Sequence, residues 1–206
     1  MSFDLSVIPH KNILLAVTGG IAAYKSAILV RRLKDFGFDV RVVMTQGAQA
    51  FITPLTFQAL SGNPVHTELL SPEAEAGMGH IELARWADLV LVAPASCDSI
   101  AKFAHGLADD LLSTLYLATN APVWVAPAMN QQMWAAKATQ RNLKTLVEDG
   151  VHVIMPDAGE QACGDVGLGR MPEPEDLARQ VAAYFHQQQR ELAEKFGLLA
   201  GKNVTI

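Results

Sequence analysis

The stretch NILLAVTGGIAAYKSAILVRRLKDFGFDVRVVMT, residues 12–45, contains one complete strand–helix–strand unit. Its opening, NILLAVTG, is a short apolar run bounded by glycine, as in a buried strand. Residues 20–37 then place apolar side chains at helical spacing and close on Gly37, which predicts a helix. FDVRVVMT, residues 38–45, predicts a second strand. A helix that connects two strands in this way makes them parallel neighbours in one sheet.

The same alternation continues along the chain. We expect helices at 80–87, 98–118 and 131–150, strands at 88–95, 121–129 and 151–156, and a terminal helix at 173–197. Strands and helices in this order predict an α/β fold, a doubly wound parallel sheet with helices on both faces. The expected strands are apolar on both faces, which fits strands buried between two helical layers.

Composition limits the class of protein. The chain has 206 residues, half of them apolar, which suits one domain with a substantial core. Its net charge of -5, without a local cluster of Lys or Arg, disfavours a nucleic-acid partner. Cys97 and Cys163 are too few for a disulfide framework and lack zinc-site spacing. No secretion signal and no membrane-length apolar run is visible. We therefore expect a cytoplasmic protein with a small-molecule ligand, away from membranes.

Ligands of doubly wound sheets bind beyond the carboxyl ends of the strands. Glycine-containing or polar segments follow four of the expected strands. They are TGGIAA at 18–23, TQGAQA at 45–50, PASCDS at 94–99 and PAMNQQMW at 127–134. Because the carboxyl ends of parallel strands share one edge, these segments should together form the binding site.

The first of these segments can bind phosphate through backbone N–H groups at a helix N-terminus, although a tight turn would look the same. It is neither a Walker loop nor G-x-G-x-x-G. The second strand ends at Thr45, where dinucleotide-binding folds place an acidic residue. NAD is therefore disfavoured, and a mononucleotide such as FMN remains. Ser96 and Ser99 could hold a phosphate or a flavin edge, or Ser96 or Asp98 could simply cap a helix.

Five stretches together resemble the flavin-dependent cysteine decarboxylase family. They are TGGIAAYK, residues 42–62, residues 79–96, PAMNQQMW and ACGDVGLGRM. Within that family the resemblance is to the phosphopantothenoylcysteine decarboxylases, the amino-terminal halves of bifunctional bacterial coenzyme A biosynthesis proteins. It implies a Rossmann-like (flavodoxin-like) fold, bound FMN, homo-oligomers in which trimers group into dodecamers, and an active site at a subunit boundary. One departure is PASCDS, where the family has PASANT.

The resemblance also implies a domain division. Residues 1–197 would be the FMN-binding decarboxylase domain, and residues 198–206 a linker and the first strand of a truncated synthetase domain. The chain would then be a fragment of a longer protein with that fused domain.

The implied reaction converts 4'-phosphopantothenoylcysteine to 4'-phosphopantetheine through oxidation to a thioaldehyde, loss of carbon dioxide and reduction of an enethiol. His80 would be the base or a substrate-orienting group, and Cys163 would complete the reduction. Asn130, whose amide can both donate and accept, would bind substrate beside Met129, and Arg170 would anchor its phosphate. The implied cofactor-binding residues are Gly19, Gly20, Ile21, Ala22, Thr45, Ala48, Ser96 and Ser99.

The remaining expectations concern the segment around Cys163, metal binding and alternative functions. Several glycines around Cys163 predict a segment without a persistent fold that closes as a lid over the ligand. No metal is expected, because the H-x-E of residues 80–82 has no P-C-x-x-C companion. Two other functions remain open: a flavin-binding regulatory subunit without turnover, and a flavin prenyltransferase of the same fold.

Overall fold

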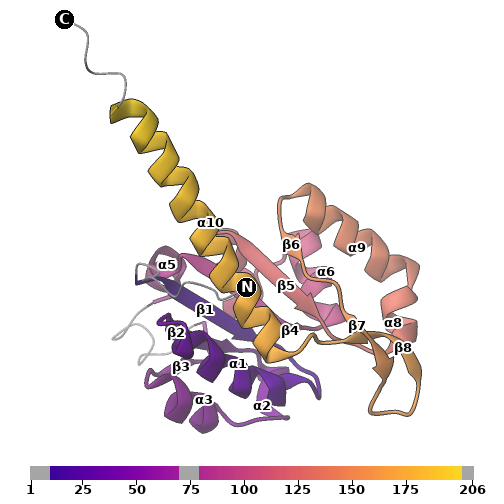
Figure 1. Cartoon of the computed structure of the whole chain (residues 1–206). Coiled ribbons are helices and arrows are strands. Elements are labelled where there is room, and N and C mark those ends of the chain that lie inside the picture. The colour runs from indigo at the N-terminus through magenta and orange to yellow at the C-terminus, as the bar shows by residue number, and fades with distance from the viewer. Residues whose placement is uncertain (1–9, 70–78, 201–206) are drawn as a thin grey trace, which may run out of the picture.

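The computed structural model describes residues 10–69 and 79–200, with side chains described up to residue 196. In this part of the chain six parallel strands form the central sheet in the order β3-β2-β1-β4-β5-β6 (Figure 1). They are β1 (Asn12–Val17), β2 (Asp39–Met44), β3 (Val65–His66), β4 (Leu89–Ala95), β5 (Val123–Pro127) and β6 (His152–Val153). The predicted doubly wound parallel sheet is confirmed. Without the two-residue edge strand β3, the order is that of flavodoxin-like sheets.

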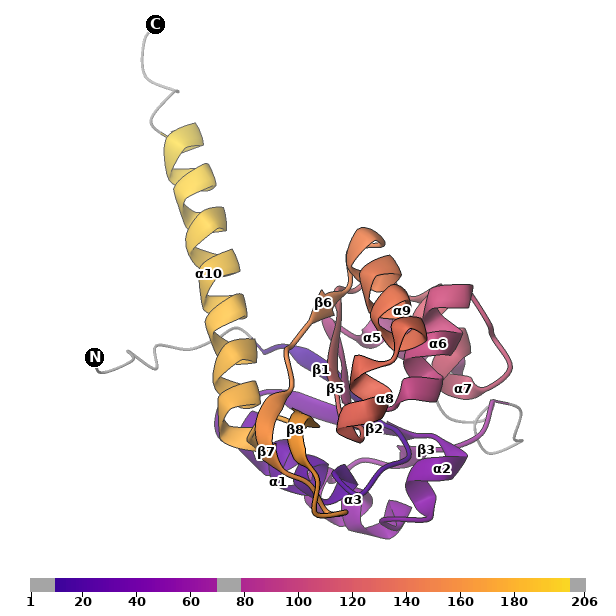
Figure 2. The ribbon, with the colours of Figure 1, turned by 90° about the vertical axis from the view of Figure 1, so that its right-hand side faces the viewer.

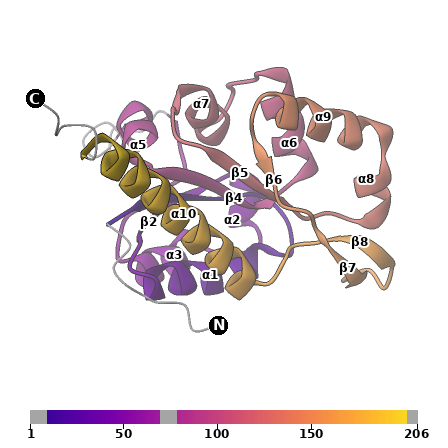
Figure 3. The same cartoon turned by 45° about the horizontal axis from the view of Figure 1, so that its top comes forward.

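Helices cover both faces of the sheet (Figure 3). One layer is formed by α1 (Ala23–Asp35), α3 (Pro54–Ser61) and α10 (Pro174–Ala200). The other is formed by α5 (His80–Trp86), α6 (Cys97–His105), α7 (Leu111–Ala118) and α9 (Lys137–Glu148). The short helices α2 (Gln46–Gln49) and α8 (Gln131–Ala135) follow β2 and β5, at the carboxyl edge of the sheet.

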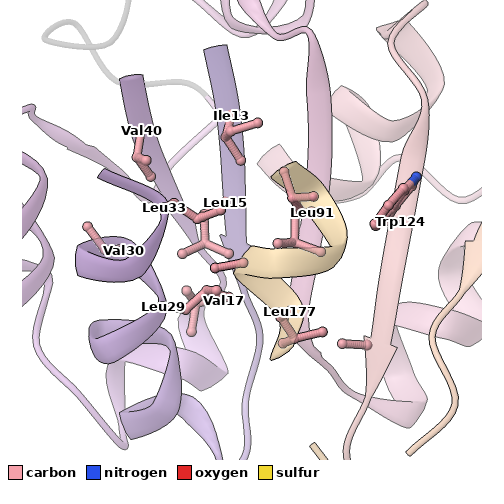
Figure 4. Packing of buried hydrophobic residues seen from close by; sticks show 14 of the residues in the cluster. Ile13, Leu15, Val17, Leu29, Val30, Leu33, Val40, Leu91, Trp124 and Leu177 are labelled. Atoms are coloured by element: carbon pink, nitrogen blue, oxygen red, sulfur yellow. The ribbon is translucent and has the colours of Figure 1, made fainter. Parts of the chain in front are cut away.

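The core consists of two apolar layers, one on each side of the sheet. Strand β1 serves both, because successive side chains of a strand point to opposite faces. Ile13, Leu15 and Val17 face the α1 layer, and Leu14 and Ala16 face the other; all five are fully buried. Figure 4 shows the first layer, with side chains of β1, α1 and α10 gathered together. Each fully buried Leu or Val stabilises the fold by about 2 kcal/mol.

Two predicted helices are each interrupted in the structure. The helix expected at 98–118 is divided into α6 and α7, because Gly106 ends α6 in a left-handed conformation (φ 64°). Asp110 then begins α7 with a capping box, in which its carboxylate accepts the Ser113 N–H. The helix expected at 131–150 is divided at Ala136, which has extended backbone. The Gln140 side chain donates to the Trp134 carbonyl at the end of α8, which stabilises this break.

The remaining differences lie at loops and at the end of the chain. We predicted no helix or strand between residues 46 and 69, where the structure has α2, α3 and β3. Helix α10 continues to Ala200, and its second half extends away from the sheet (Figure 2). Residues 201–206, in which the synthetase strand was expected, lie outside the described residues, so the domain division stays a prediction. No described helix is both long and apolar enough to cross a membrane.

Candidate active site

The ends of β1 and β4 are joined at the point where the strand order reverses. Thr18, directly after β1, is fully buried. Its hydroxyl donates to the Pro94 carbonyl (2.7 Å) and accepts the Ser96 N–H (2.8 Å). A Cβ on the next residue, Gly19, would lie 3.1 Å from the Gly47 carbonyl carbon. Glycine is needed here because the loops after β1 and β2 meet backbone to backbone.

Three helices begin at this edge of the sheet. Ala22 caps α1 without a side-chain hydrogen bond, and in the first turn the Ala23 and Lys25 N–H groups donate to the Gly20 (3.0 Å) and Ala22 (2.9 Å) carbonyls. Thr45 caps α2, and its hydroxyl accepts the Ala48 N–H (3.3 Å). Ser96 caps α6, accepts the Ser99 N–H (3.2 Å) and contacts the Ser99 hydroxyl (3.1 Å). The capping role considered for Ser96 is therefore present in the structure. The side chains of Ala48 and Ser99 are buried.

A β-hairpin lies beside these loops. It consists of β7 (Asp157–Glu160) and β8 (Val166–Arg170), which pair antiparallel between β6 and α10 (Figure 2). The Met129 N–H donates to the Gly169 carbonyl (2.9 Å). The Gln161 side chain accepts the Gln131 N–H (3.0 Å) and donates to the Met129 carbonyl (3.3 Å). The hairpin is thus attached to the loop that follows β5.

This hairpin differs from the expected segment without a persistent fold. Two of the glycines that suggested flexibility instead permit close packing. A Cβ on Gly167 would collide with the Gln131 side chain, and one on Gly169 with the Met129 carbonyl oxygen. These residues are therefore required by the close approach of the hairpin to the loop after β5. The structure gives the segment a defined fold, a two-stranded hairpin attached to the loop after β5.

The hairpin tip brings Cys163 to Asn130. The Asn130 side-chain nitrogen lies 3.4 Å from the Cys163 sulfur and donates to the Asp165 carboxylate (2.8 Å). The Asn130 side-chain oxygen accepts the Gln132 N–H (2.8 Å), so Asn130 also caps α8. Cys163 is exposed, and its sulfur lies 3.5 Å from the same Asp165 oxygen. The sequence analysis missed Asp165, although it stands two residues after Cys163 in the same motif.

A cavity of about 570 Å³ opens between the start of α1, the loop after β5 and the hairpin. Its lining includes Ile21 and Ala22 from the first loop, Met129 and Asn130 after β5, and Cys163 and Arg170 from the hairpin. All six were predicted site residues. The volume is in the range of cavities that bind cofactors and small substrates. The structure thus gathers two of the eight predicted cofactor-binding residues, all three predicted substrate-binding residues and Cys163 around one space.

Lys25 is a lining residue that the sequence analysis did not single out. Its side chain is buried, and its ammonium group donates to the Met171 carbonyl (2.8 Å) and the Glu173 carboxylate (2.7 Å). Arg170 is exposed, with its guanidinium 3.9 Å from the same Glu173 carboxylate. Together these contacts connect α1 to the base of the hairpin and place two cations beside the cavity. The sequence signal that could have identified Lys25 is its position on the face of the predicted helix that carries the buried apolar residues.

His80 is not brought to this cavity. It is the first residue of α5, as predicted, but α5 packs against α7 on the face of the sheet opposite α1. The other six predicted cofactor-binding residues stand at the carboxyl edge of the sheet without lining the cavity: Gly19, Gly20, Thr45, Ala48, Ser96 and Ser99. Their roles toward a cofactor remain predictions.

The described residues fit a flavin mononucleotide. The positive end of the α1 dipole would attract its phosphate, and Gly20 leaves open space where a side chain would stand. The loops after β2 and β4 add hydroxyl groups, and the cavity is large enough for a planar ring system beside Met129. Among the described residues, no group of three or more His, Cys, Asp or Glu side chains could hold a metal ion.

Comparisons with known proteins agree with this geometry. The Flavoprotein family model matches residues 5–186. The coenzyme A biosynthesis bifunctional protein CoaBC of Vibrio vulnificus (strain YJ016) is 57% identical over 191 residues, which are 93% of this chain and 47% of that protein. CoaBC of Escherichia coli (strain K12) is 59% identical over 175 residues, 85% of this chain and 43% of that protein. The chain thus spans about half the length of these curated relatives.

Solved structures show the same similarity. A cysteine-to-serine mutant of PPC decarboxylase, complexed with pantothenoylaminoethenethiol, has a TM-score of 0.76 and 34% identity, covering 86% of this chain and 100% of that one. The FMN-dependent cysteine decarboxylase SpaF has a TM-score of 0.74 and 30% identity, covering 88% of this chain and 98% of that one. Both similarities cover more than four fifths of this chain.

Proposed function

The chain belongs to the flavoprotein family, and we propose that it catalyses the FMN-dependent decarboxylation of 4'-phosphopantothenoylcysteine in coenzyme A biosynthesis. One observation carries this proposal. An exposed thiol, Cys163, lies 3.4 Å from the amide of Asn130 at the mouth of a ligand-sized cavity. A regulatory flavin-binding subunit would need the cavity but would not need this thiol and amide together.

When bound, FMN would supply the two-electron redox chemistry of this reaction. The chain's own residues would bind and orient the substrate. The Asn130 oxygen has a second lone pair beyond the one used by Gln132, and it can accept a substrate N–H. Arg170 would bind the phosphate through its guanidinium, which suits phosphate oxygens.

Cys163 would donate a proton when the enethiol is reduced to the final thiol. Its exposure at the hairpin tip allows contact with a ligand in the cavity, and the hairpin would exclude water from that contact. The expected product is 4'-phosphopantetheine.

His80 would act as the base or orient the substrate from a second copy of the chain. Within one chain α5 lies on the other side of the sheet from α1, so a homo-oligomer with its active site at the subunit boundary would supply the missing group. Trimers that group into dodecamers would provide such boundaries. A fused synthetase domain, as the bifunctional relatives suggest, and a cytoplasmic location complete the proposal.

Substitution of the thiol tests the assignment. Cys163→Ser should retain FMN, seen as visible absorption, and should release the oxidised enethiol in place of phosphopantetheine. His80→Asn should stop the reaction before carbon dioxide is lost. Cys97→Ala is the matched control, because this half-buried thiol contacts Thr139 (3.3 Å) away from the cavity. It should keep full activity. Normal phosphopantetheine formation by Cys163→Ser would contradict the assignment.

A further inference from the structure

Asp165 contacts the two side chains that the proposed reaction depends on, without lining the cavity itself. One carboxylate oxygen accepts the Asn130 side-chain N–H at 2.8 Å and lies 3.5 Å from the Cys163 sulfur. The residue is half-buried at the hairpin tip, between β7 and β8. Its backbone carbonyl also accepts the Gln161 N–H (2.7 Å), which closes the tip. The carboxylate is therefore fixed where both groups meet.

The contact determines which way the Asn130 amide faces. Its oxygen accepts the Gln132 N–H, so its nitrogen must point to the hairpin. A carboxylate can only accept hydrogen bonds, and thus it pairs with that nitrogen and never with the oxygen. Asp165 and the start of α8 together exclude the flipped amide. The Asn130 oxygen is then directed to the same place in every molecule.

The same carboxylate acts on the Cys163 thiol. An S–H group can donate to a carboxylate, whereas a thiolate beside it would be repelled. In the described residues no Lys or Arg forms an ion pair with Asp165, since Lys25 and Arg170 are both directed to Glu173. The negative charge near the sulfur is thus not compensated by an ion pair. The carboxylate gives the S–H group an acceptor, so that the S–H points in a defined direction.

We propose that Asp165 is a positioning residue that holds the Asn130 amide and the Cys163 S–H group in one arrangement, so that the proton leaves the sulfur only for a bound substrate. The contacts with Asn130 and Cys163 stand on the geometry alone. The consequence for turnover rests on the proposed decarboxylase function. Two measurements therefore test the contacts and their consequence for turnover separately. The first measures thiol reactivity and the second measures catalysis.

The first measurement is the rate at which iodoacetamide alkylates Cys163 in the flavin-loaded protein at neutral pH. The thiolate is the reactive form, so removal of the carboxylate charge should accelerate alkylation. For Asp165→Asn we expect about a fivefold faster rate, the order given by two unit charges about 4 Å apart in a water-like medium. Mass spectrometry of tryptic peptides distinguishes the two cysteines, because Cys163 lies between Lys144 and Arg170 and Cys97 lies before Lys102.

Two further variants serve as controls. Asp165→Glu keeps the charge and should be alkylated within about twofold of the wild-type rate. Asp157→Asn removes an exposed carboxylate from the same hairpin and should leave the rate unchanged. A wild-type rate in Asp165→Asn, or an equal acceleration in Asp165→Glu, would overturn the proposal. Accelerated alkylation in Asp165→Glu would overturn the proposal even if Asp165→Asn does not fold.

The second measurement is steady-state turnover of phosphopantothenoylcysteine. Asp165→Asn should lower kcat for phosphopantetheine about tenfold and release some enethiol, with KM within about threefold because the amide can still accept from Asn130. A purely structural role would instead lower flavin content and thermal stability together, leaving the ratio of enethiol to phosphopantetheine unchanged, and that result would overturn the proposal. A wild-type protein that leaves the substrate unchanged would refute the decarboxylase function, while the alkylation rates would still test the role of Asp165.

Discussion

Substitution of Gly169 by alanine should disable the site without unfolding the domain. Gly169 has φ of +138°, and an added Cβ would stand 2.7 Å from the Gln161 side-chain nitrogen and closer still to the Met129 carbonyl oxygen. Strand β8 would have to withdraw by about 1 Å to restore ordinary contact distances. That movement breaks the Met129 to Gly169 hydrogen bond and weakens the two made by Gln161. At about 1 kcal/mol for each bond, attachment of the hairpin would lose about 2–3 kcal/mol.

The catalytic effect should exceed the effect on global stability. A displacement of about 1 Å in a catalytic group can reduce the rate about 100-fold, and Cys163 moves with the hairpin. We expect kcat/KM for carbon dioxide release to fall about 100-fold in Gly169→Ala, while the urea midpoint changes little, because most of the core lies between the sheet and its helices.

The matched control is Gly150→Ala. Gly150 also has a positive φ (+88°), but its added Cβ would meet nothing within 4 Å, and it lies after α9. This variant should lose about 1 kcal/mol of stability to backbone strain and keep kcat/KM within about twofold. If Gly169→Ala kept kcat/KM within about threefold of this control, the idea that close hairpin docking positions Cys163 would be refuted.

Three further predictions concern stability and cofactor binding. Thr18→Val leaves the part-buried Ser96 N–H without its acceptor, while the Pro94 carbonyl still accepts the Thr18 N–H. It should cost about 1–2 kcal/mol in urea unfolding, with weaker FMN retention. Burial, with the nearby charge of Arg41, lowers the pKa of His66, so the unfolded chain binds its proton more readily. Stability should therefore fall as the pH drops below 6.5, and comparison of urea midpoints at about pH 7.5 and about pH 5.5 should show a smaller fall in His66→Gln. Burial alone would raise the pKa of Asp110, but hydrogen bonds, first that of Lys102, hold it below its usual value of 3.8. Asp110→Asn should thus cost about 1 kcal/mol near neutral pH, a difference that disappears as the pH falls below that value.

The buried sheet could be predicted from sequence because its signal is local. Each central strand is a short run of apolar residues, and each crossover helix has its own apolar spacing. The division between α6 and α7 was missed, although Gly106 and Asp110 mark it in the sequence, because the apolar periodicity continues across them. The break at Ala136 was not predicted, because no glycine or proline marks it in the sequence; the Gln140 side chain stabilises it through the Trp134 carbonyl, six residues earlier.

The site was only partly predictable for a similar reason. Asn130 and Cys163 are 33 positions apart, and the resemblance of their motifs to a known family identified both. The hairpin carries no alternation of apolar and polar residues, and its fold depends on the loop after β5. Lys25 meets a carboxylate 148 positions away, a pairing that no local pattern indicates. Asp165 and Gln161 were missed because their partners are likewise supplied by tertiary structure.

The central claim is most directly tested by the mass of the product formed when the purified, yellow protein is incubated with phosphopantothenoylcysteine. The structure and the proposed roles of its residues predict loss of carbon dioxide and the mass of phosphopantetheine. A flavin-loaded protein that returns the substrate unchanged, under conditions in which a known decarboxylase converts it, would contradict the claim.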